Sequence, residues 1–350
     1  MHMADALLSP AVGAAFWAGT IGTIGYASRK LTAQSDDRKI PLMGVLGAFI
    51  FASQMINFTI PGTGASGHLG GGMILAALLG PHAAFLVMSS VLTVQALFFA
   101  DGGLMALGCN IWNLGIYPCF VAYPLIYKPL AGDGRSARRI LVASLAGGIV
   151  GLQIGSASVV LQTLLSGKSG LPFVPFLLMM QPIHLAIGIV EGFVTAGVIR
   201  YVRAARPEIL DGPASAGPLP AGISLRNVLV GFLALAIVTG GAISWFASAH
   251  PDGLEWAIGK VTGKKEPPGP GRGVPAALKS VQEKTALLPG YGFKPPADET
   301  KAKEEAPSWP AVDAGASISG LIGGVLVLGL VLGIGGLIRA FRGRRSGNRA

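Results

Sequence analysis

Long apolar stretches dominate this sequence and restrict what the chain can fold into. A helix needs about 20 mostly apolar residues to cross a bilayer. Only 13% of the 350 residues are charged, whereas soluble domains carry about a quarter. The chain is therefore predicted to be an all-α integral membrane protein with about nine spans. The predicted spans cover residues 6–27, 40–58, 69–80, 82–100, 103–127, 140–165, 174–199, 227–248 and 316–338.

Lysine and arginine gather after alternate spans, which predicts the orientation in the membrane. Basic residues beside spans favour the cytoplasmic side, so the N-terminus is expected to be extracytoplasmic. The net charge of +10 then reflects orientation in a lipid bilayer and indicates no nucleic-acid partner. We expect the cytoplasmic or inner membrane of a bacterium or archaeon. The basic clusters are Arg29, Lys30, Arg38 and Lys39; Lys128, Arg135, Arg138 and Arg139; Arg200, Arg203, Arg206 and Arg226; and Arg339, Arg342, Arg344, Arg345 and Arg349.

One segment interrupts the apolar pattern. Residues 250–313 are rich in Pro, Lys and Glu and show no apolar period, which is typical of a flexible loop. This outer loop divides the chain into a seven-helix core over 1–205, a cytoplasmic linker over 206–223 and a two-helix C-terminal hairpin over 224–350.

The first two residues offer an unusual set of nitrogen atoms. Met1 has its α-amine, and His2 has its backbone nitrogen and its ring, which together can form fused chelate rings around one metal ion. Planar nitrogen coordination suits Ni²⁺ or Cu²⁺. The acidic Asp5 and the lack of a basic leader argue against a cleaved signal peptide, so Met1 is expected to remain in place. The alternative is that His2 is simply an exposed terminal residue.

The best candidate for a fourth ligand is His68, which follows the glycine-rich stretch Pro61–Gly67. Glycine allows backbone to approach a bound ion closely, and the stretch is expected on the same side as the N-terminus. Ser66, two residues earlier, is a candidate to support the ligands. As an alternative, His68 only caps the next helix.

Four further polar residues lie within predicted spans. His184 and Glu191 are seven residues apart and share one helical face. They could line a metal path or support the ligands, since ionisable groups in spans are usually functional, or they could hydrogen-bond neighbouring helices. Asn110 and Asn113 could orient the histidine loop, although asparagine also joins membrane helices.

The remaining reactive residues are assigned structural roles. Asp5 could balance the charge of a cation, but capping of the first helix is its more common use. His82 follows a proline at a predicted cytoplasmic turn. Cys109 and Cys119 lack the spacing of a thiolate metal site and are expected to pack as small apolar residues.

Three separated motifs resemble the CbiM/NikM family. They are the start Met1–Pro10, the stretch Ser66–His68 and the segment Phe99–Asn113, with the sequence FADGGLMALGCNIWN. They occur in the family's order, and the resemblance covers about residues 1–205. Its members are the substrate-capture (S) components of energy-coupling-factor (ECF) transporters for cobalt and nickel.

The resemblance implies a ligand set and partners. In the family, the terminal amine, the second residue's backbone and ring nitrogens and a loop histidine hold the metal, which implies Met1, His2 and His68 here. The spacing over Gly62–Ser66 is looser than the family's common Gly-Thr-Ser-Gly-His form. A transmembrane coupling (T) subunit and ATP-binding cassette ATPase subunits are the implied partners. A face of small residues at i, i+4 spacing on the first helix, around Ala14 and Ala18, is where the coupling subunit docks in the family; internal packing is the alternative.

The C-terminal hairpin carries its own motif. Residues His250–Trp256 read HPDGLEW and resemble the PDGLE segment of the small CbiN/NikN partner, here joined to the core in one chain.

Together these features predict capture and release of Ni²⁺ or Co²⁺ as substrate, with nickel slightly favoured by planar geometry and with no permanent cofactor. The chain is not expected to be an enzyme, because Gly167-Lys168-Ser169 lacks the first glycine of a nucleotide-binding loop. An ion-coupled secondary transporter would show more buried acids, and a metal-dependent intramembrane enzyme would show an HExxH helix. Capture should weaken below about pH 6, because nitrogen ligands must lose protons.

Overall fold

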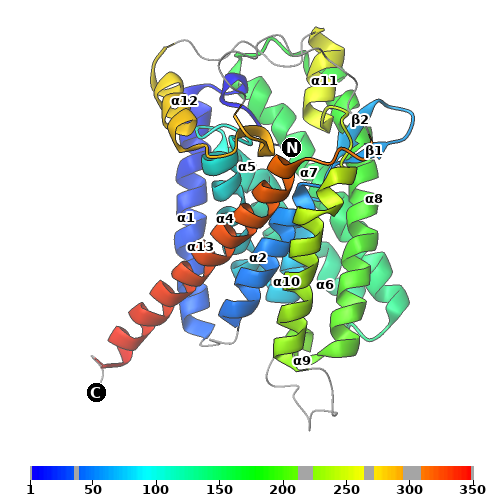
Figure 1. Ribbon diagram of the computed structural model, residues 1–350, viewed down its shortest axis with the longest axis vertical. Coiled ribbons are helices and arrows are strands. Elements are labelled where there is room, and N and C mark those ends of the chain that lie inside the picture. The colour runs from blue at the N-terminus through cyan, green and yellow to red at the C-terminus, as the bar shows by residue number, and fades with distance from the viewer. Residues whose placement is uncertain (1, 35–38, 212–223, 264–271, 295–308, 348–350) are drawn as a thin grey trace.

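The computed structural model describes residues 2–34, 39–211, 224–263, 272–294 and 309–347 as a bundle of helices (Figure 1). The α-helices are α1 (Pro10–Gln34), α2 (Lys39–Gln54), α3 (Gly72–Leu79), α4 (Pro81–Phe99), α5 (Leu107–Ile111), α6 (Lys128–Ala131), α7 (Ala137–Ser166), α8 (Phe173–Ala205), α9 (Glu208–Asp211), α10 (Leu225–Gly241), α11 (Gly253–Thr262), α12 (Val274–Thr285) and α13 (Ala314–Gly347). A π-helix, η2 (Trp112–Tyr127), continues α5, and short 3₁₀ helices lie at η1 (Asp5–Leu7), η4 (Ile243–Phe246) and η5 (Pro289–Tyr291). Two strands, β1 (Phe58–Ile60) and β2 (Ala65–Gly67), pair antiparallel.

Each predicted span overlaps at least one helix. Four helices in the described part of the chain are long and apolar enough to cross a membrane: α4, α7, α8 and residues Ala314–Ala340 of α13. α2 and α10 are apolar but shorter than 18 residues. The chain is thus a helical membrane protein, and nine crossings remain a prediction.

The two ends of the bundle differ. The N-terminus, β1, β2, α11 and α12 gather at one end, which we call the N-terminal end of the bundle (Figure 1). α9 and the C-terminal end of α13 lie at the opposite end (Figure 1). His2, near the N-terminus, and His68, just after β2, therefore lie at the same end of the bundle.

The predicted flexible loop over 250–313 differs from the structure. Its described residues contain two helices, α11 and α12, and the single turn η5. Asp252 begins α11 by accepting hydrogen bonds from the backbone N–H groups of Leu254 and Glu255 at 2.9 and 2.8 Å. The segments 264–271 and 295–308, and residues 212–223 of the predicted linker, lie outside the described residues.

Close helix packing explains the many glycines. α7 and α8 approach so closely that a Cβ on Gly192 would lie 2.6 Å from the Cα of Leu145. Gly240 of α10 and Gly320 of α13 meet backbone to backbone, which joins the two hairpin helices. Small residues at such crossings are typical of membrane helices.

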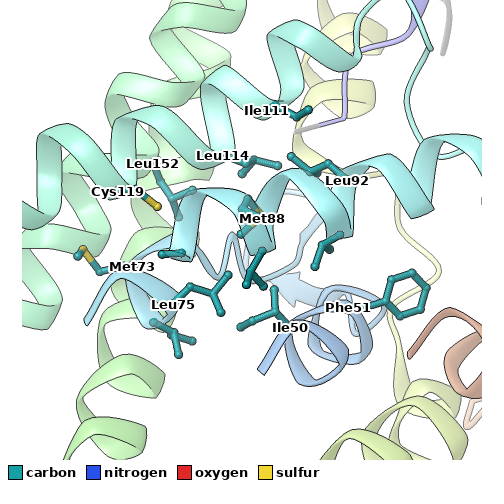
Figure 2. Packing of buried hydrophobic residues seen from close by; sticks show 14 of the residues in the cluster. Ile50, Phe51, Met73, Leu75, Met88, Leu92, Ile111, Leu114, Cys119 and Leu152 are labelled. Atoms are coloured by element: carbon teal, nitrogen blue, oxygen red, sulfur yellow. The ribbon is translucent and has the colours of Figure 1, made fainter. Parts of the chain in front are cut away.

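The apolar core lies between the helices of the bundle. Figure 2 shows buried side chains from α2, α3, α4, α5, η2 and α7 meeting in one cluster. Cys109 and Cys119 are both buried free thiols. The labelled members of the cluster are Ile50, Phe51, Met73, Leu75, Met88, Leu92, Ile111, Leu114, Cys119 and Leu152.

Candidate metal centre

Hydrogen bonds to the backbone of Met3 hold the N-terminal segment in the bundle. The Met3 side chain is fully buried. Its N–H donates to Asn110 Oδ1 at 2.8 Å, and its carbonyl accepts from Asn110 Nδ2 at 3.3 Å and from Gly103 N–H at 2.9 Å. His2 is therefore the neighbour of an anchored residue, which contradicts the alternative that it is an exposed terminal residue.

Asp5 does not cap the first long helix. Its Oδ1 accepts a hydrogen bond from the Ala106 N–H at 2.9 Å, which ties the N-terminal segment to the loop before α5. Burial raises the pKa of this carboxyl, while backbone hydrogen bonds from Ala106 and Met105 oppose the rise. At the start of α1, the Ser9 hydroxyl accepts from the Val12 N–H at 3.4 Å.

His68 lies just after β2 with its ring fixed. Its Nδ1 lies 2.9 Å from the Leu69 carbonyl oxygen, an acceptor, so Nδ1 carries the hydrogen and Nε2 carries the lone pair. Burial lowers the pKa of His68 to about 3, so the ring is neutral at ordinary pH. Its Nε2 is buried without a hydrogen-bond partner.

The loop after His68 is capped from a distant helix. α3 begins after Gly71, and His68 does not cap it, because its Nδ1 faces the Leu69 carbonyl and its Nε2 has no hydrogen-bond partner. Glu191 of α8 takes that role: its Oε2 accepts from the Gly70 N–H at 2.8 Å and its Oε1 from the Met73 N–H at 3.4 Å.

The two histidine rings meet face to face. The centroids of His2 and His68 lie 5.2 Å apart, with an angle of 12° between the planes. The Nε2 of His2 is also buried and unpartnered, whereas its Nδ1 lies 3.1 Å from Asp101 Oδ1. Each ring thus has one buried imidazole nitrogen without a partner, and imidazole nitrogen suits late first-row metal ions.

The two rings cannot form a complete site alone. The described residues contain no group of three or more His, Cys, Asp and Glu side chains that could hold a metal ion. The predicted ligand Met1 lies outside the described residues. The predicted chelate uses His2 Nδ1, which here faces Asp101, so its formation requires the His2 ring to turn.

Asp101 and Tyr291 form a pair beside His2. The Tyr291 hydroxyl donates to Asp101 Oδ2 at 2.5 Å. Although burial raises the pKa of Asp101, its contacts with His2 and Tyr291 hold that pKa below the usual range. Neither residue was singled out from the sequence. Asp101 lies inside the motif Phe99–Asn113, whereas nothing in the sequence marks Tyr291.

The HPDGLEW segment lies beside the two-stranded sheet of β1 and β2, which precedes His68. Ser66 donates its N–H to the Pro251 carbonyl and its hydroxyl to the His250 carbonyl, both at 2.8 Å. The Trp256 indole N–H donates to the Thr63 carbonyl at 3.0 Å. The C-terminal hairpin thus supports the histidine loop directly, and Ser66 is one of the points of attachment.

A cavity of about 870 Å³ opens at this end of the bundle. Its lining includes His2, His68, Asp101, Asp252 and Tyr291. The core and the C-terminal hairpin therefore share one chamber around the two rings.

The other predicted site residues take separate positions. His184 lines a second, small cavity with His68, and its Nδ1 lies 2.7 Å from the Met180 carbonyl oxygen. Asn113 is paired with Gln162 through hydrogen bonds of 2.9 and 3.0 Å. Asn110 and Asn113 therefore contact the N-terminal segment and α7, and not the histidine loop as predicted. His82 packs against aromatic rings of α1 and η2.

The fold and this site define a class of protein, a helical membrane protein of transition-metal transport. A solved structure described as a transition metal transporter is similar over 62% of this chain and all of its own, at 28% identity and a TM-score of 0.52. Residues 2–209 match the family described as the cobalt uptake substrate-specific transmembrane region, CbiM, and the chain belongs to that family. Residues 226–340 match the PDGLE domain.

Two relatives are similar to this chain over different shares of its length. The fused nickel transport protein NikMN of Rhodobacter capsulatus is 31% identical over 83% of this chain and 88% of its own length. The cobalt transport protein CbiM of Sorangium cellulosum is 32% identical over 60% of this chain and 95% of its own length. The chain is thus a cobalt/nickel transport membrane protein in which core and PDGLE domain are fused.

Proposed function

We propose that this chain is the metal-capturing S component of an ATP-driven ECF uptake transporter. It binds Ni²⁺ or Co²⁺ at its extracytoplasmic end and releases the ion as the transporter turns over. The observation that carries the proposal is the position of His68, whose ring centroid lies 5.2 Å from that of His2 and whose Nε2 is buried and unpartnered. An unpaired buried polar atom is costly, and a bound metal would relieve that cost.

The ligand set that we propose is the α-amine of Met1, the backbone and ring nitrogens of His2, and Nε2 of His68. Four nitrogen ligands in a plane favour Ni²⁺ over Co²⁺, so nickel is the slightly favoured substrate. Relatives named for nickel and for cobalt transport support either ion as cargo.

In this proposal, partner subunits supply the free energy for transport. The chain itself is not an enzyme in this proposal. ATP-binding cassette ATPase subunits hydrolyse ATP and act on this chain through a transmembrane coupling subunit. Ala11, Ala14, Ala15 and Ala18 are exposed along α1. This strip of small side chains supports close docking of the coupling subunit within the inner membrane of a bacterium or archaeon.

Calorimetric titration of Ni²⁺ and Co²⁺ into the purified chain with a native N-terminus tests the proposal. His2→Ala, His68→Ala and a variant with one added N-terminal residue should each lose tight binding. His82→Ala, which changes a histidine packed against α1 and η2, serves as the matched control and should bind as wild type does. Wild-type affinity in the extended variant would show that the amine is not a ligand, and wild-type affinity in His68→Ala would overturn the site.

A further inference from the structure

The peptide unit between Leu69 and Gly70 is held at both of its polar ends. Its carbonyl oxygen, which belongs to Leu69, lies 2.9 Å from Nδ1 of His68. Its N–H, which belongs to Gly70, donates to Glu191 Oε2 at 2.8 Å. Because a peptide unit is planar, these two groups turn together. The carboxylate of Glu191 on α8 and the imidazole of His68 are therefore connected through one rigid group.

Glycine at position 70 lets the carboxylate approach this peptide closely. A Cβ on Gly70 would lie 2.9 Å from Glu191 Oε2 and 2.9 Å from Leu152 Cδ2. Gln54 of α2 holds the same glycine from the other side, since its Nε2 donates to the Gly70 carbonyl at 2.8 Å. Both side chains are buried. The backbone that follows His68 is therefore fixed from two helices, α2 and α8.

The orientation of the Leu69–Gly70 peptide decides which nitrogen of His68 is available to a metal ion. A neutral imidazole has its hydrogen on one nitrogen and a lone pair on the other, and a hydrogen bond at one of them selects the tautomer. With the Leu69 carbonyl facing Nδ1, the hydrogen stays on Nδ1 and the lone pair lies on the buried, unpartnered Nε2. If the peptide turned, the hydrogen could move to Nε2, and the proposed ligand atom would be lost.

We propose that Glu191 is a positioning residue for His68, holding the Leu69–Gly70 peptide so that the lone pair of the ring stays on Nε2. The inference rests on the proposed function, since it concerns a support of the same site. It goes beyond capping of the loop, because it assigns Glu191 an effect on the ligand atom itself. Partners of metal ligands in other proteins change affinity by about 10- to 100-fold when they are replaced.

The test replaces Glu191 in the full chain with a native N-terminus. Glu191→Ala removes both acceptor oxygens, so calorimetry should show Ni²⁺ affinity reduced by about tenfold. In the metal-free protein, ¹⁵N shifts of the His68 ring, assigned with His68→Asn, should show the hydrogen moving from Nδ1 towards Nε2. Glu191→Gln keeps an oxygen for the Gly70 N–H and should recover most of the affinity and the original tautomer. Glu191→Met keeps the side-chain volume without an acceptor and should behave as Glu191→Ala does.

Thr195→Ala is the matched control for packing. Thr195 lies one turn further along α8, is fully buried, and has a hydroxyl without a hydrogen-bond partner. This change shortens a buried side chain of the same helix without touching the peptide, so both readouts should stay as in wild type. Equal changes for Thr195→Ala and Glu191→Ala would assign the effect to packing and overturn the inference.

The tautomer separates the failure of this inference from the failure of the proposed function. If Glu191→Ala and Glu191→Met leave the hydrogen on Nδ1 of His68, Glu191 does not position the ring and the inference is overturned. If His2→Ala and His68→Ala keep wild-type affinity, the proposed metal site fails, whereas the ¹⁵N shifts of the metal-free protein still decide the role of Glu191.

Discussion

The imidazole rings of His2 and His68 lie stacked with 5.2 Å between their centroids, although the two residues come from different segments of the chain. Each ring has its Nδ1 beside an oxygen acceptor, Asp101 for His2 and the Leu69 carbonyl for His68. Each therefore directs an unpartnered Nε2 into the protein interior. His68 thus has the lone pair of Nε2 available for an ion, whereas the His2 ring must turn from Asp101 before Nδ1 can bind one.

The acid response of His68 follows from its burial. Its pKa in the folded protein is about 3, below the value of about 6.5 expected in the unfolded chain. Between these values the unfolded chain binds more protons, so this group's contribution to stability rises with pH and is lost as pH falls from about 6.5 towards about 3. The NMR signals of His68 should remain those of a neutral ring at about pH 5.

The thermal midpoint provides a second check on the same group. It should fall on acidification in the wild type and fall less steeply in His68→Asn, which has no titrating ring. A midpoint with the same pH slope in both proteins, or a His68 signal that titrates near its ordinary pKa, would contradict the expectation. If His68 stays neutral as expected, the predicted loss of metal capture below about pH 6 comes from the other nitrogen ligands.

Asn110 anchors the N-terminal segment, so Asn110→Leu should weaken metal binding. The substitution keeps the approximate size of the side chain and leaves the Met3 N–H without its acceptor, at a cost of about 1–3 kcal/mol. Calorimetry should show a loss of about tenfold or more in Ni²⁺ affinity, and the metal-free protein should melt earlier. Asn227→Leu, at an exposed asparagine of α10, is the control; equal affinities for the two variants would rule out the anchoring role.

The positions of the helices could be predicted from the sequence, but the structure of the outer segment could not. Apolar stretches identify spans because the bilayer imposes the pattern on each helix separately. α12 instead docks through hydrogen bonds: Thr285 donates to the Leu97 carbonyl and Gln282 to the Gly102 carbonyl. Hydrogen bonds to backbone carbonyls need no regular spacing of apolar residues. The sequence of this segment therefore indicated a flexible loop.

For the candidate site, the two histidines could be predicted and their surroundings could not. His2 and His68 lie in recognisable motifs, whereas their supports come from residues far away in the sequence. Glu191 caps the loop of His68 from α8, and Tyr291 contacts Asp101 from the hairpin. Local rules favoured capping for Asp5 and offered it as the alternative for His68, because such rules cannot include a partner more than a hundred residues away.

Replacing Glu191 should separate its role as an acceptor from its charge. Glu191→Gln keeps one oxygen that can accept from the Gly70 N–H, so metal affinity should fall by no more than a few fold. Glu191→Ala leaves the Gly70 and Met73 N–H groups buried and unpaired, which should destabilise the protein by about 1–3 kcal/mol and weaken Ni²⁺ binding further. Thermal unfolding and calorimetry measure the two effects. If Gln and Ala behave alike, the carboxylate acts through its charge, and the capping interpretation fails.

The docking of the PDGLE-domain segment on the histidine loop predicts a specific effect of Trp256→Phe. The change keeps an aromatic ring and removes the indole N–H that donates to Thr63, which should destabilise the contact by about 1 kcal/mol. A looser hairpin frees His68 more often, so bound Ni²⁺ should dissociate about fivefold faster, a factor that corresponds to that energy. Stopped-flow transfer of the metal to an excess of chelator measures the rate. Trp309→Phe is the matched control, because Trp309 is 71% exposed and its indole N–H lies a longer 3.4 Å from the Phe246 carbonyl. Equal dissociation rates for wild type and Trp256→Phe would mean that the segment does not hold the loop in the metal-bound protein.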